Sequence, residues 1–249
     1  MNIGEFPKAT DPKQYDLPET QWHLRGAEDS PSRKYLRESL DSFVEIDAIK
    51  DKKILDIGSG TGHLFNWLKE KGASDIQGID PSEANIKTST EKYPWATSHL
   101  STLKKFSETT KEKFDTAFAV MVIEHIEDLQ VAFQEISQLL ADNGKLILVM
   151  GDKDDELSSE TGQGKHIVMA EIVRQLADGA IEVKIERNLG GGVTSTIFDI
   201  LRPVESVRES ANVAGFELIV EKPIMNKSAS KSGKPICHML SFIKRQNSK

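Results

Sequence analysis

The sequence predicts an α/β fold: a Rossmann-like, doubly wound domain whose seven-stranded sheet is mostly parallel, has its last strand antiparallel and carries helices on both faces. Two observations support this prediction. From Lys52 to Met150, short apolar segments bounded by turn residues alternate with amphipathic segments of helical length, which is the order of a parallel sheet with crossover helices. A glycine-rich turn at 58–62 joins the first apolar segment to a helix, as in folds that bind ligands at the carboxyl ends of their strands.

The elements have local signals of their own. Ser30 and Pro31 form a helix start before the amphipathic segment 31–45. The expected strands are 52–57, 74–80, 95–99, 114–122, 145–150, 216–222 and 236–244. The link between the last two strands is long enough for a hairpin but too short for a crossover helix. The last strand is therefore expected to run antiparallel to its neighbours.

Residues 151–205 interrupt this alternation and are predicted to form an insertion, a lid or hairpin beside the ligand site. An acidic, Gly- and Ser-rich loop opens the insertion, and a helix is expected near 166–177. Two alternating segments, 181–186 and 194–201, flank three consecutive glycines. This arrangement predicts a β-hairpin within the insertion.

The polar segment 1–30 shows no sustained period, and a single domain is expected to span 31–249. Tyr15, Trp22 and His23 stand out in the N-terminal segment because their neighbours are polar. Two interpretations of these side chains remain open. They fold over the ligand site as a lid, or they anchor the segment to the protein surface.

Composition restricts the class of protein. Cys237 is the only cysteine, which excludes an intrachain disulfide and a cysteine-based zinc cluster, and the six histidines show no metal-ligand spacing, so no metal is expected. With 39 acidic and 32 basic residues, the net charge of −7 offers no general attraction for phosphate backbones, so nucleic acid is not the expected partner. No apolar run approaches the roughly 18 residues of a membrane span, and no secretory signal is evident. We expect a cytoplasmic protein.

The stretch ILDIGSGTGHL at 54–64 is the most informative part of the sequence. Its glycines permit a sharp turn and a close approach of ligand to backbone: Gly58, Gly60 and Gly62. His63 stands where a dinucleotide fingerprint has a small residue, and no Lys-Ser/Thr pair follows, so neither that site nor a P-loop is predicted. The carboxylate of Asp56 would repel a pyrophosphate but suits a cationic ligand. Asp80, at the end of the second strand, can accept hydrogen bonds from both hydroxyls of an adenosine ribose.

Four segments, in this order and spacing, resemble successive motifs of the class I S-adenosylmethionine-dependent methyltransferases: ILDIGSGTGHL (54–64), IQGIDPS (76–82), FDTAFAVMVIEHIED (114–128) and LADNGKLILVM (140–150). The resemblance covers about residues 31–150. The segment 199–219 is similar to the C-terminal part of the small-molecule, UbiE/UbiG-like branch. The resemblance implies S-adenosylmethionine as cofactor and methyl transfer to an O, N or C nucleophile of a small molecule.

The same resemblance implies a set of cofactor-binding residues: Asp56, Gly58, Ser59, Gly60, Gly62, His63, Asp80, Pro81, Ser82, Ser101, Thr102 and Val120. The glycine loop would hold the methionine portion of the cofactor, Asp80 the ribose, and Pro81 would lie beside the adenine. The family often has an acidic residue after the third strand to accept the adenine amino group. Here the stretch reads HLSTLKK at 99–105, and Ser101 or Thr102 is the expected substitute.

His125 is the candidate catalytic residue. It follows the strand 114–122 at the edge where open α/β sheets bind ligands, and the resemblance puts its position near the transferred methyl group. An imidazole titrates near neutrality and can accept a proton from an acceptor hydroxyl or amine. The alternative is a histidine that only packs the loop.

Three rival functions are compatible with parts of the sequence. A nicotinamide-dependent oxidoreductase is disfavoured by His63 and Asp56. A tRNA-modifying methyltransferase stays open because such enzymes share the EHIED-like segment. A catalytically silent S-adenosylmethionine-binding module is less compatible with the intact cofactor motifs. The sequence predicts neither the identity of the acceptor nor the oligomeric state.

Overall fold

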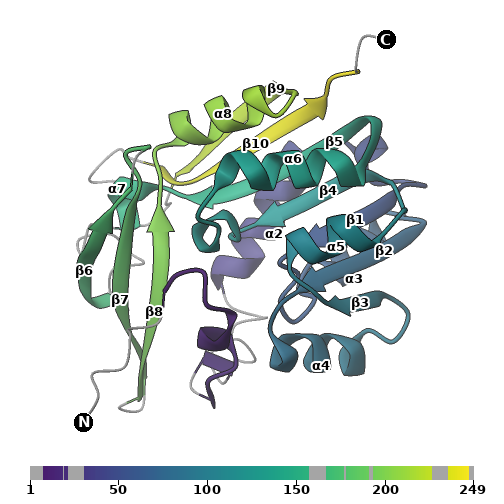
Figure 1. Cartoon of the computed structure of the whole chain (residues 1–249). Helices are drawn as coiled ribbons and strands as arrows, with labels where there is room; N and C mark the ends of the chain where they lie inside the picture. The colour runs from purple at the N-terminus through teal and green to yellow at the C-terminus, as the bar shows by residue number, and fades with distance from the viewer. Residues whose placement is uncertain are drawn as a thin grey trace.

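The computed structural model describes residues 8–18, 20–21, 31–156, 167–176, 178–190, 193–225 and 235–246 (Figure 1). Seven strands form one sheet in the order β3-β2-β1-β4-β5-β10-β9. Their bounds are β1 Lys53–Ile57, β2 Asp75–Asp80, β3 Thr97–Leu100, β4 Phe114–Val120, β5 Leu140–Gly151, β9 Phe216–Met225 and β10 Pro235–Lys244. In this sheet β10 alone runs opposite to the other six strands, and it pairs antiparallel with β5 and β9, so the predicted topology is confirmed.

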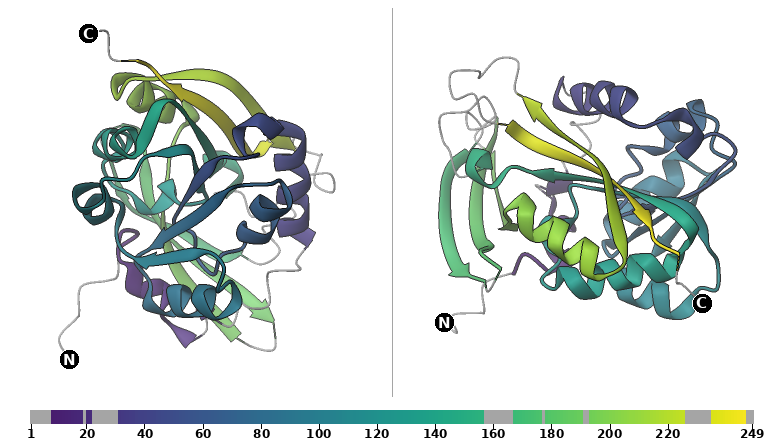
Figure 2. Two further views of the ribbon diagram at one scale, coloured as in Figure 1. Left: turned by 90° about the vertical axis from the view of Figure 1, so that its right-hand side faces the viewer. Right: turned by 90° about the horizontal axis from the view of Figure 1, so that it is seen from above.

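Helices cover both faces of this sheet (Figure 2). Their bounds are α2 Pro31–Phe43, α3 Phe65–Glu70, α4 Glu83–Lys92, α5 Leu103–Thr109, α6 Leu129–Leu139, α7 Lys153–Glu156 and α8 Val204–Val213. The side chains of each strand alternate between the two layers. Leu55 and Ile57 pack into the apolar layer that includes α5, α6 and α8, whereas Ile54 packs into the layer of α2 and α3. This two-sided burial explains why the strands appear in the sequence as continuous apolar runs.

Two helix ends follow the sequence signals directly. The Asp128 side chain accepts a hydrogen bond from the Val131 N–H at 3.0 Å and begins α6, and Ser82 caps α4 in the same way through Asn85. The short helix α5 was not anticipated. Its apolar content is small, with Phe106 as its one buried residue, so the sequence shows no helical period there.

The insertion forms a separate antiparallel sheet in the order β6-β7-β8, with β6 Ile167–Gln175, β7 Ile181–Gly190 and β8 Val193–Leu201. The predicted hairpin is therefore confirmed as β7 and β8. The helix expected near 166–177 is wrong, because this segment is β6. Its β-branched residues, Ile167, Val168, Ile172 and Val173, suit a strand, and pairing with β7 supplies the backbone partners that decide its conformation.

The N-terminal segment contains a short 3₁₀-helix, η1 Pro12–Tyr15, which lies between β8 and α4 (Figure 1). Two further 3₁₀-helices are η2 Ile46–Ala48 and η3 Ile123–His125. The expected helix cap Ser30, and the side chains of Trp22 and His23, lie outside the described residues. In the described part of the chain, no helix is long and apolar enough to cross a membrane.

Candidate functional site

The glycine turn lies at the carboxyl end of β1, and its three glycines all have positive φ angles. They differ in what a side chain would meet. A Cβ at Gly58 would lie 2.3 Å from Val122 and one at Gly62 2.8 Å from the ring of Tyr93, so both glycines serve internal packing. A Cβ at Gly60 would have no neighbour within 4 Å. Gly60 is therefore the glycine whose backbone borders open space, where a ligand can approach.

Asp80 connects this turn to the next strand. Its carboxylate accepts hydrogen bonds from the Gly60 N–H and the Ser82 N–H, each at 2.9 Å, and from the Asn85 side chain at 3.2 Å. The residue is only 7% exposed, and this desolvation raises its pKa despite the three donors. The carboxylate thus holds the turn and the start of α4 in fixed positions around one edge of the sheet.

Asp56 is buried beside Asp80 with 1% exposure, and its Oδ2 has no hydrogen-bond partner among the described residues. Desolvation and the nearby Asp80 raise the pKa of Asp56 well above its ordinary value. The hydroxyl of Ser59 is likewise buried without a partner. A buried carboxyl left unsatisfied beside the glycine turn fits a ligand that brings positive charge and hydrogen-bond donors, as the ammonium and sulfonium of S-adenosylmethionine do.

His63 follows the turn and is partly buried. Desolvation, together with the nearby guanidiniums of Arg33 and Arg37, lowers the pKa of His63 to about 3. The imidazole is therefore neutral near physiological pH. Arg33 and Arg37 come from α2 and were not anticipated. They bring cationic groups close to His63, one of the predicted cofactor contacts.

The remaining predicted cofactor contacts lie around the same sheet edge, and their roles stay predictions. Val120 is buried at the end of β4, whereas Pro81 is exposed after β2. The Thr102 hydroxyl accepts a hydrogen bond from the Lys105 N–H and caps α5, and the Ser101 hydroxyl donates to the Thr102 carbonyl. Both hydroxyls that were expected near the adenine are thus engaged in local bonds. The Ser101 N–H donates to the Asp80 carbonyl at 3.1 Å, which keeps this loop beside Asp80.

His125 lies in η3, after β4, and contacts two segments that are far away in sequence. Its Nε2 is hydrogen-bonded to the Tyr15 hydroxyl, and its Nδ1 lies 3.6 Å from Asp199 Oδ1 in β8. The imidazole also lies within electrostatic range of Asp80, at the end of β2. The structure therefore brings the predicted catalytic histidine together with a phenol and a carboxylate.

Arg202 fixes the loop that carries His125. The residue is 2% exposed, and its guanidinium donates to the carbonyls of Ile123, Ile126 and Glu127. Its Nε lies 3.5 Å from Asp178. A buried arginine that satisfies three backbone carbonyls of one loop determines where the imidazole of His125 lies. In the sequence, Arg202 directly follows an expected strand, and nothing about that place indicated this role.

The N-terminal segment connects the two sides of the site. Gln14 exchanges hydrogen bonds with the backbone of Phe198 in β8, with its Oε1 accepting from the Phe198 N–H at 2.9 Å. Asp16 accepts from the Ser82 hydroxyl at 2.6 Å and from the Ala84 N–H at 3.2 Å, at the start of α4. Residues 11–16 therefore span from the insertion to the cofactor edge, across His125.

Comparison with known proteins gives the family. Residues 29–183 match the family described as methyltransferase domain. A mitochondrial ubiquinone biosynthesis O-methyltransferase of Homo sapiens is 36% identical over 115 residues, which are 41% of this chain and 29% of the human protein. A tRNA U34 carboxymethyltransferase of Ruthia magnifica is 29% identical over 109 residues, which are 41% of this chain and 34% of that protein. The chain thus spans about a third of the length of these relatives.

Among solved structures, an S-adenosylmethionine-dependent methyltransferase from Mesorhizobium loti superposes with a TM-score of 0.60. The alignment covers 83% of this chain and 96% of that one at 17% identity, so it supports the fold. The family match covers more than half of the chain and includes the glycine turn, Asp80 and His125. The chain belongs to the methyltransferase domain family.

Proposed function

We propose that this protein transfers the methyl group of S-adenosylmethionine to an O, N or C nucleophile of a small molecule. The observation that carries the proposal is the pairing of two features at one sheet edge. One is the unsatisfied carboxyl of Asp56, which lies near Asp80 and the open backbone of Gly60. The other is His125, a titratable group held beside it. A pure binding module would need the first feature but not the second.

The cofactor supplies a methyl group already activated on a positively charged sulfur. The chain has to place the nucleophile in line with that methyl group, exclude water and remove a proton where the nucleophile carries one. Asp56 and Asp80 bind and orient the cofactor in this proposal, and His125 is the candidate proton acceptor. Arg202 supports this role because it fixes the carbonyls on both sides of His125.

A small acceptor is favoured over RNA by charge. The net charge of −7 gives no general attraction for a phosphate backbone. The N-terminal segment and the β6–β8 sheet lie around His125, which favours a compact acceptor. The similarity to a tRNA carboxymethyltransferase keeps RNA as the second candidate. Tight, salt-sensitive binding of tRNA together with its methylation would favour that alternative.

Two measurements test the proposal. Isothermal titration calorimetry on the purified chain should detect S-adenosylmethionine binding, and a screen with labelled cofactor should find transfer to a compound among phenols, alcohols, amines, carboxylates and quinols, with tRNA included. A chain that does not bind the cofactor contradicts the proposal outright. Binding without transfer to any acceptor class would leave a non-catalytic module.

The insertion is proposed to select the acceptor. Replacing residues 152–201 by a short Gly/Ser linker removes β6–β8 and should spare cofactor binding while abolishing transfer. Loss of cofactor binding in a folded variant would contradict this division of roles. A cytoplasmic location is also part of the proposal, supported by Cys237 as the only cysteine in the chain.

A further inference from the structure

Three side chains from distant segments meet in a row near the cofactor edge. Tyr15 belongs to η1, His125 to η3 and Asp199 to β8. The Tyr15 hydroxyl contacts Nε2 of His125, and Asp199 faces the opposite ring nitrogen, Nδ1, at 3.6 Å. The rings of Tyr15 and His125 meet edge to face, with centroids 5.1 Å apart. The imidazole therefore lies between a phenol hydrogen-bonded to Nε2 and a carboxylate within ion-pair distance of Nδ1.

Asp199 occupies a place where a carboxylate is costly. It lies opposite Val183 in the β7–β8 register, on the strand face that carries Ile181, Ile185, Ile197 and Leu201. Asp199 is 7% exposed. Burying a carboxylate among aliphatic side chains costs free energy unless a partner compensates it. The neighbouring imidazole is such a partner, which indicates that Asp199 is placed for His125 rather than for the stability of the small sheet.

The N-terminal segment holds Tyr15 in place from both sides. Gln14 binds the backbone of β8 on one side of Tyr15, and Asp16 binds the start of α4 on the other. Gln21 adds a bond from its side chain to the Tyr15 carbonyl and another to Asn85 Oδ1 at 2.8 Å. If the N-terminal segment were only anchored to the surface, the residues on both sides of Tyr15 would not need to be held in this way.

We propose that Tyr15, His125 and Asp199 form a proton relay and that the methyl acceptor is a hydroxyl compound, an alcohol or a phenol, whose hydroxyl contacts Tyr15. The inference rests on the proposed methyl transfer. Tyr15 is a catalytic residue in this arrangement because it touches the acceptor. Asp199 is a positioning residue because it acts through His125.

The relay conserves atoms and charge. The acceptor oxygen forms a bond to the methyl carbon while the bond from that carbon to sulfur breaks, and its electron pair stays on sulfur. The acceptor proton passes to the Tyr15 oxygen as the Tyr15 proton passes to Nε2 of His125. The resulting imidazolium is stabilised by Asp199 at Nδ1 and later loses its proton to water.

The chemistry of the acceptor follows from the need for this relay. A neutral amine attacks with its free electron pair and can lose its proton after transfer. An alcohol or phenol is a weak nucleophile until its proton is being removed, so a base in contact with the oxygen accelerates that reaction. A hydroxyl group both donates and accepts a hydrogen bond. An acceptor hydroxyl can therefore donate to the oxygen of Tyr15, whose own proton is donated to His125.

The charged groups around His125 set the expected pH dependence. Asp199 faces it from β8, Tyr15 from η1 and Asp80 acts from the end of β2. Glu124, in η3 itself, points to the Gly151 N–H, and Arg202 binds the adjoining carbonyls. The nearby carboxylates favour the imidazolium. Asp199→Asn should therefore move the acid limb of the kcat/KM profile to lower pH, which a purely structural loss would not do.

The decisive experiment combines NMR on the ligand-free protein with kinetics. Ring ¹⁵N–¹H spectra, assigned with His125→Gln, should show the Nδ1–H tautomer at His125, with the Nε2 signal perturbed in Tyr15→Phe. Asp199→Asn should weaken the tautomer preference. An Nε2–H tautomer in the wild-type protein would overturn the relay, whatever the activity of the enzyme.

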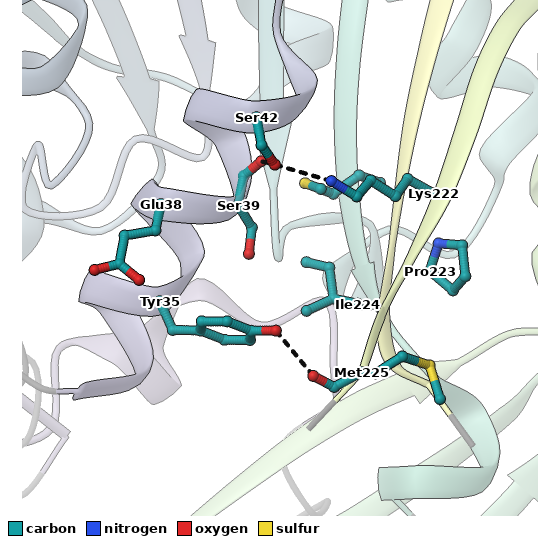
Figure 3. Close-up of a pocket in the computed structure, with 9 residues that line it drawn as sticks. Tyr35, Glu38, Ser39, Ser42, Lys222, Pro223, Ile224 and Met225 are labelled. Atoms are coloured by element: carbon teal, nitrogen blue, oxygen red, sulfur yellow. Dashed lines mark hydrogen bonds between the residues drawn. The ribbon is translucent and has the colours of Figure 1, made fainter. Parts of the chain in front are cut away.

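In kinetics, Tyr15→Phe should lower kcat by about 10²-fold or more with the affinity for S-adenosylmethionine unchanged. The matched control is Tyr35→Phe, because the Tyr35 hydroxyl donates to the Met225 carbonyl in the groove between α2 and β9, apart from His125 (Figure 3). This control should keep wild-type kcat. Equal kcat values for Tyr15→Phe and the wild type would contradict the role of Tyr15.

The acceptor class is tested with matched compounds, 4-methylphenol against 4-methylaniline and benzyl alcohol against benzylamine, within the wider screen. Turnover of hydroxyl compounds that depends on Tyr15 supports the inference. Turnover confined to amines or carboxylates overturns it while leaving methyl transfer intact. Failure of S-adenosylmethionine binding in calorimetry would instead remove the proposed function, so the two failures are distinguishable.

Discussion

The proposed cofactor side and the proposed catalytic side of this site are built in different ways. On the cofactor side, Asp56, Gly60 and Asp80 come from two adjacent parallel strands and the turn between them, with Asp56 in register with Gly78. On the catalytic side, Tyr15 and His125 are 110 residues apart in sequence, and Asp199 comes from a different sheet. One side is a local motif of the sheet, and the other is assembled from separate segments.

This difference predicts that the two sides can be disturbed independently. The bonds of Asp80 to the Gly60 and Ser82 N–H groups hold the cofactor side together without help from the insertion. The catalytic side depends on Arg202 and on the N-terminal segment, neither of which contacts Asp56 or Gly60 in a bond of the described structure. Variants on the catalytic side should change turnover, and variants on the cofactor side should change affinity.

The largest effect is expected at His125. His125→Ala should lower kcat by about 10²–10⁴, because it removes the group that accepts the proton in the transition state. The dissociation constant of S-adenosylmethionine should stay close to the wild-type value. Steady-state kinetics and calorimetry on the same preparation measure both quantities. A nearly unchanged kcat with an identified acceptor would return His125 to a packing role.

Arg202 should affect stability and turnover together. Arg202→Met leaves the carbonyls of Ile123, Ile126 and Glu127 without their buried donor, so the free energy of unfolding should fall by about 2–4 kcal/mol. Urea denaturation measures this loss. Arg208→Met is the control, because its ion pairs with Glu205 and Glu221 are partly exposed and should contribute less than about 1 kcal/mol. Equal losses in the two variants would refute the special role of Arg202.

Asp80 and Gly60 should control affinity. Asp80→Ala should weaken cofactor binding by about 1.5–3 kcal/mol, the range for a hydrogen bond to a charged group. Gly60→Val should also reduce binding, because its side chain would occupy the space that borders the turn and its φ of 55° is unfavourable for a β-branched residue. Calorimetry on folded variants is the measurement. Wild-type affinity in both would contradict the assignment of the cofactor side.

The smallest effect is expected at Asp56. Replacing its carboxyl group should increase the stability of the ligand-free protein, whereas the change at Arg202 should reduce stability. Since the pKa of Asp56 is raised in the folded protein, the folded state binds this proton more tightly than the unfolded state does. Stability is therefore lost as pH rises above 3.8, the ordinary value of the group, toward the raised pKa. Asp56→Asn should raise the melting temperature of the ligand-free protein at pH 7 and less so at pH 4, while weakening cofactor binding.

Thermal unfolding followed by circular dichroism at the two pH values checks this prediction. Asp47→Asn serves as the control, because the Asp47 side chain is 72% exposed. A lower melting temperature for Asp56→Asn at pH 7 would mean that the carboxyl group stabilises the ligand-free fold. The cofactor side would then be built for stability as well as for binding.

Sequence reasoning worked where the signal was local. The glycine turn, Asp80 and the strands β1, β2, β4 and β5 have apolar runs or turn residues that hardly depend on distant contacts. The helix expected near 166–177 failed because a β-branched segment of moderate hydrophobicity takes its conformation from a partner strand, β7. The short helix α5 was missed because one buried residue makes no period.

The candidate site divides in the same way. Asp56, Gly60, Asp80 and His125 were predicted from the sequence because each stands at a strand end within a motif. Asp199 and Arg202 were not predicted from the sequence. For Asp199 there was a usable signal, because it is an aspartate among the isoleucines of an alternating strand. Tyr15 was singled out, but only as part of a lid or an anchored tail.

By itself, the sequence determined the strands β1, β2, β4 and β5, the glycine turn and the acidic residues around it, since these depend on residues within one strand-turn-helix unit. The tertiary structure decided which distant side chains meet. Its pairing of β7 with β8 put Asp199 on the face toward His125, and the contacts of Gln14 and Asp16 carried Tyr15 to the other ring nitrogen. The physical reason is that sequence periodicity records which face of an element is buried, whereas the partner across that face is chosen by packing between elements.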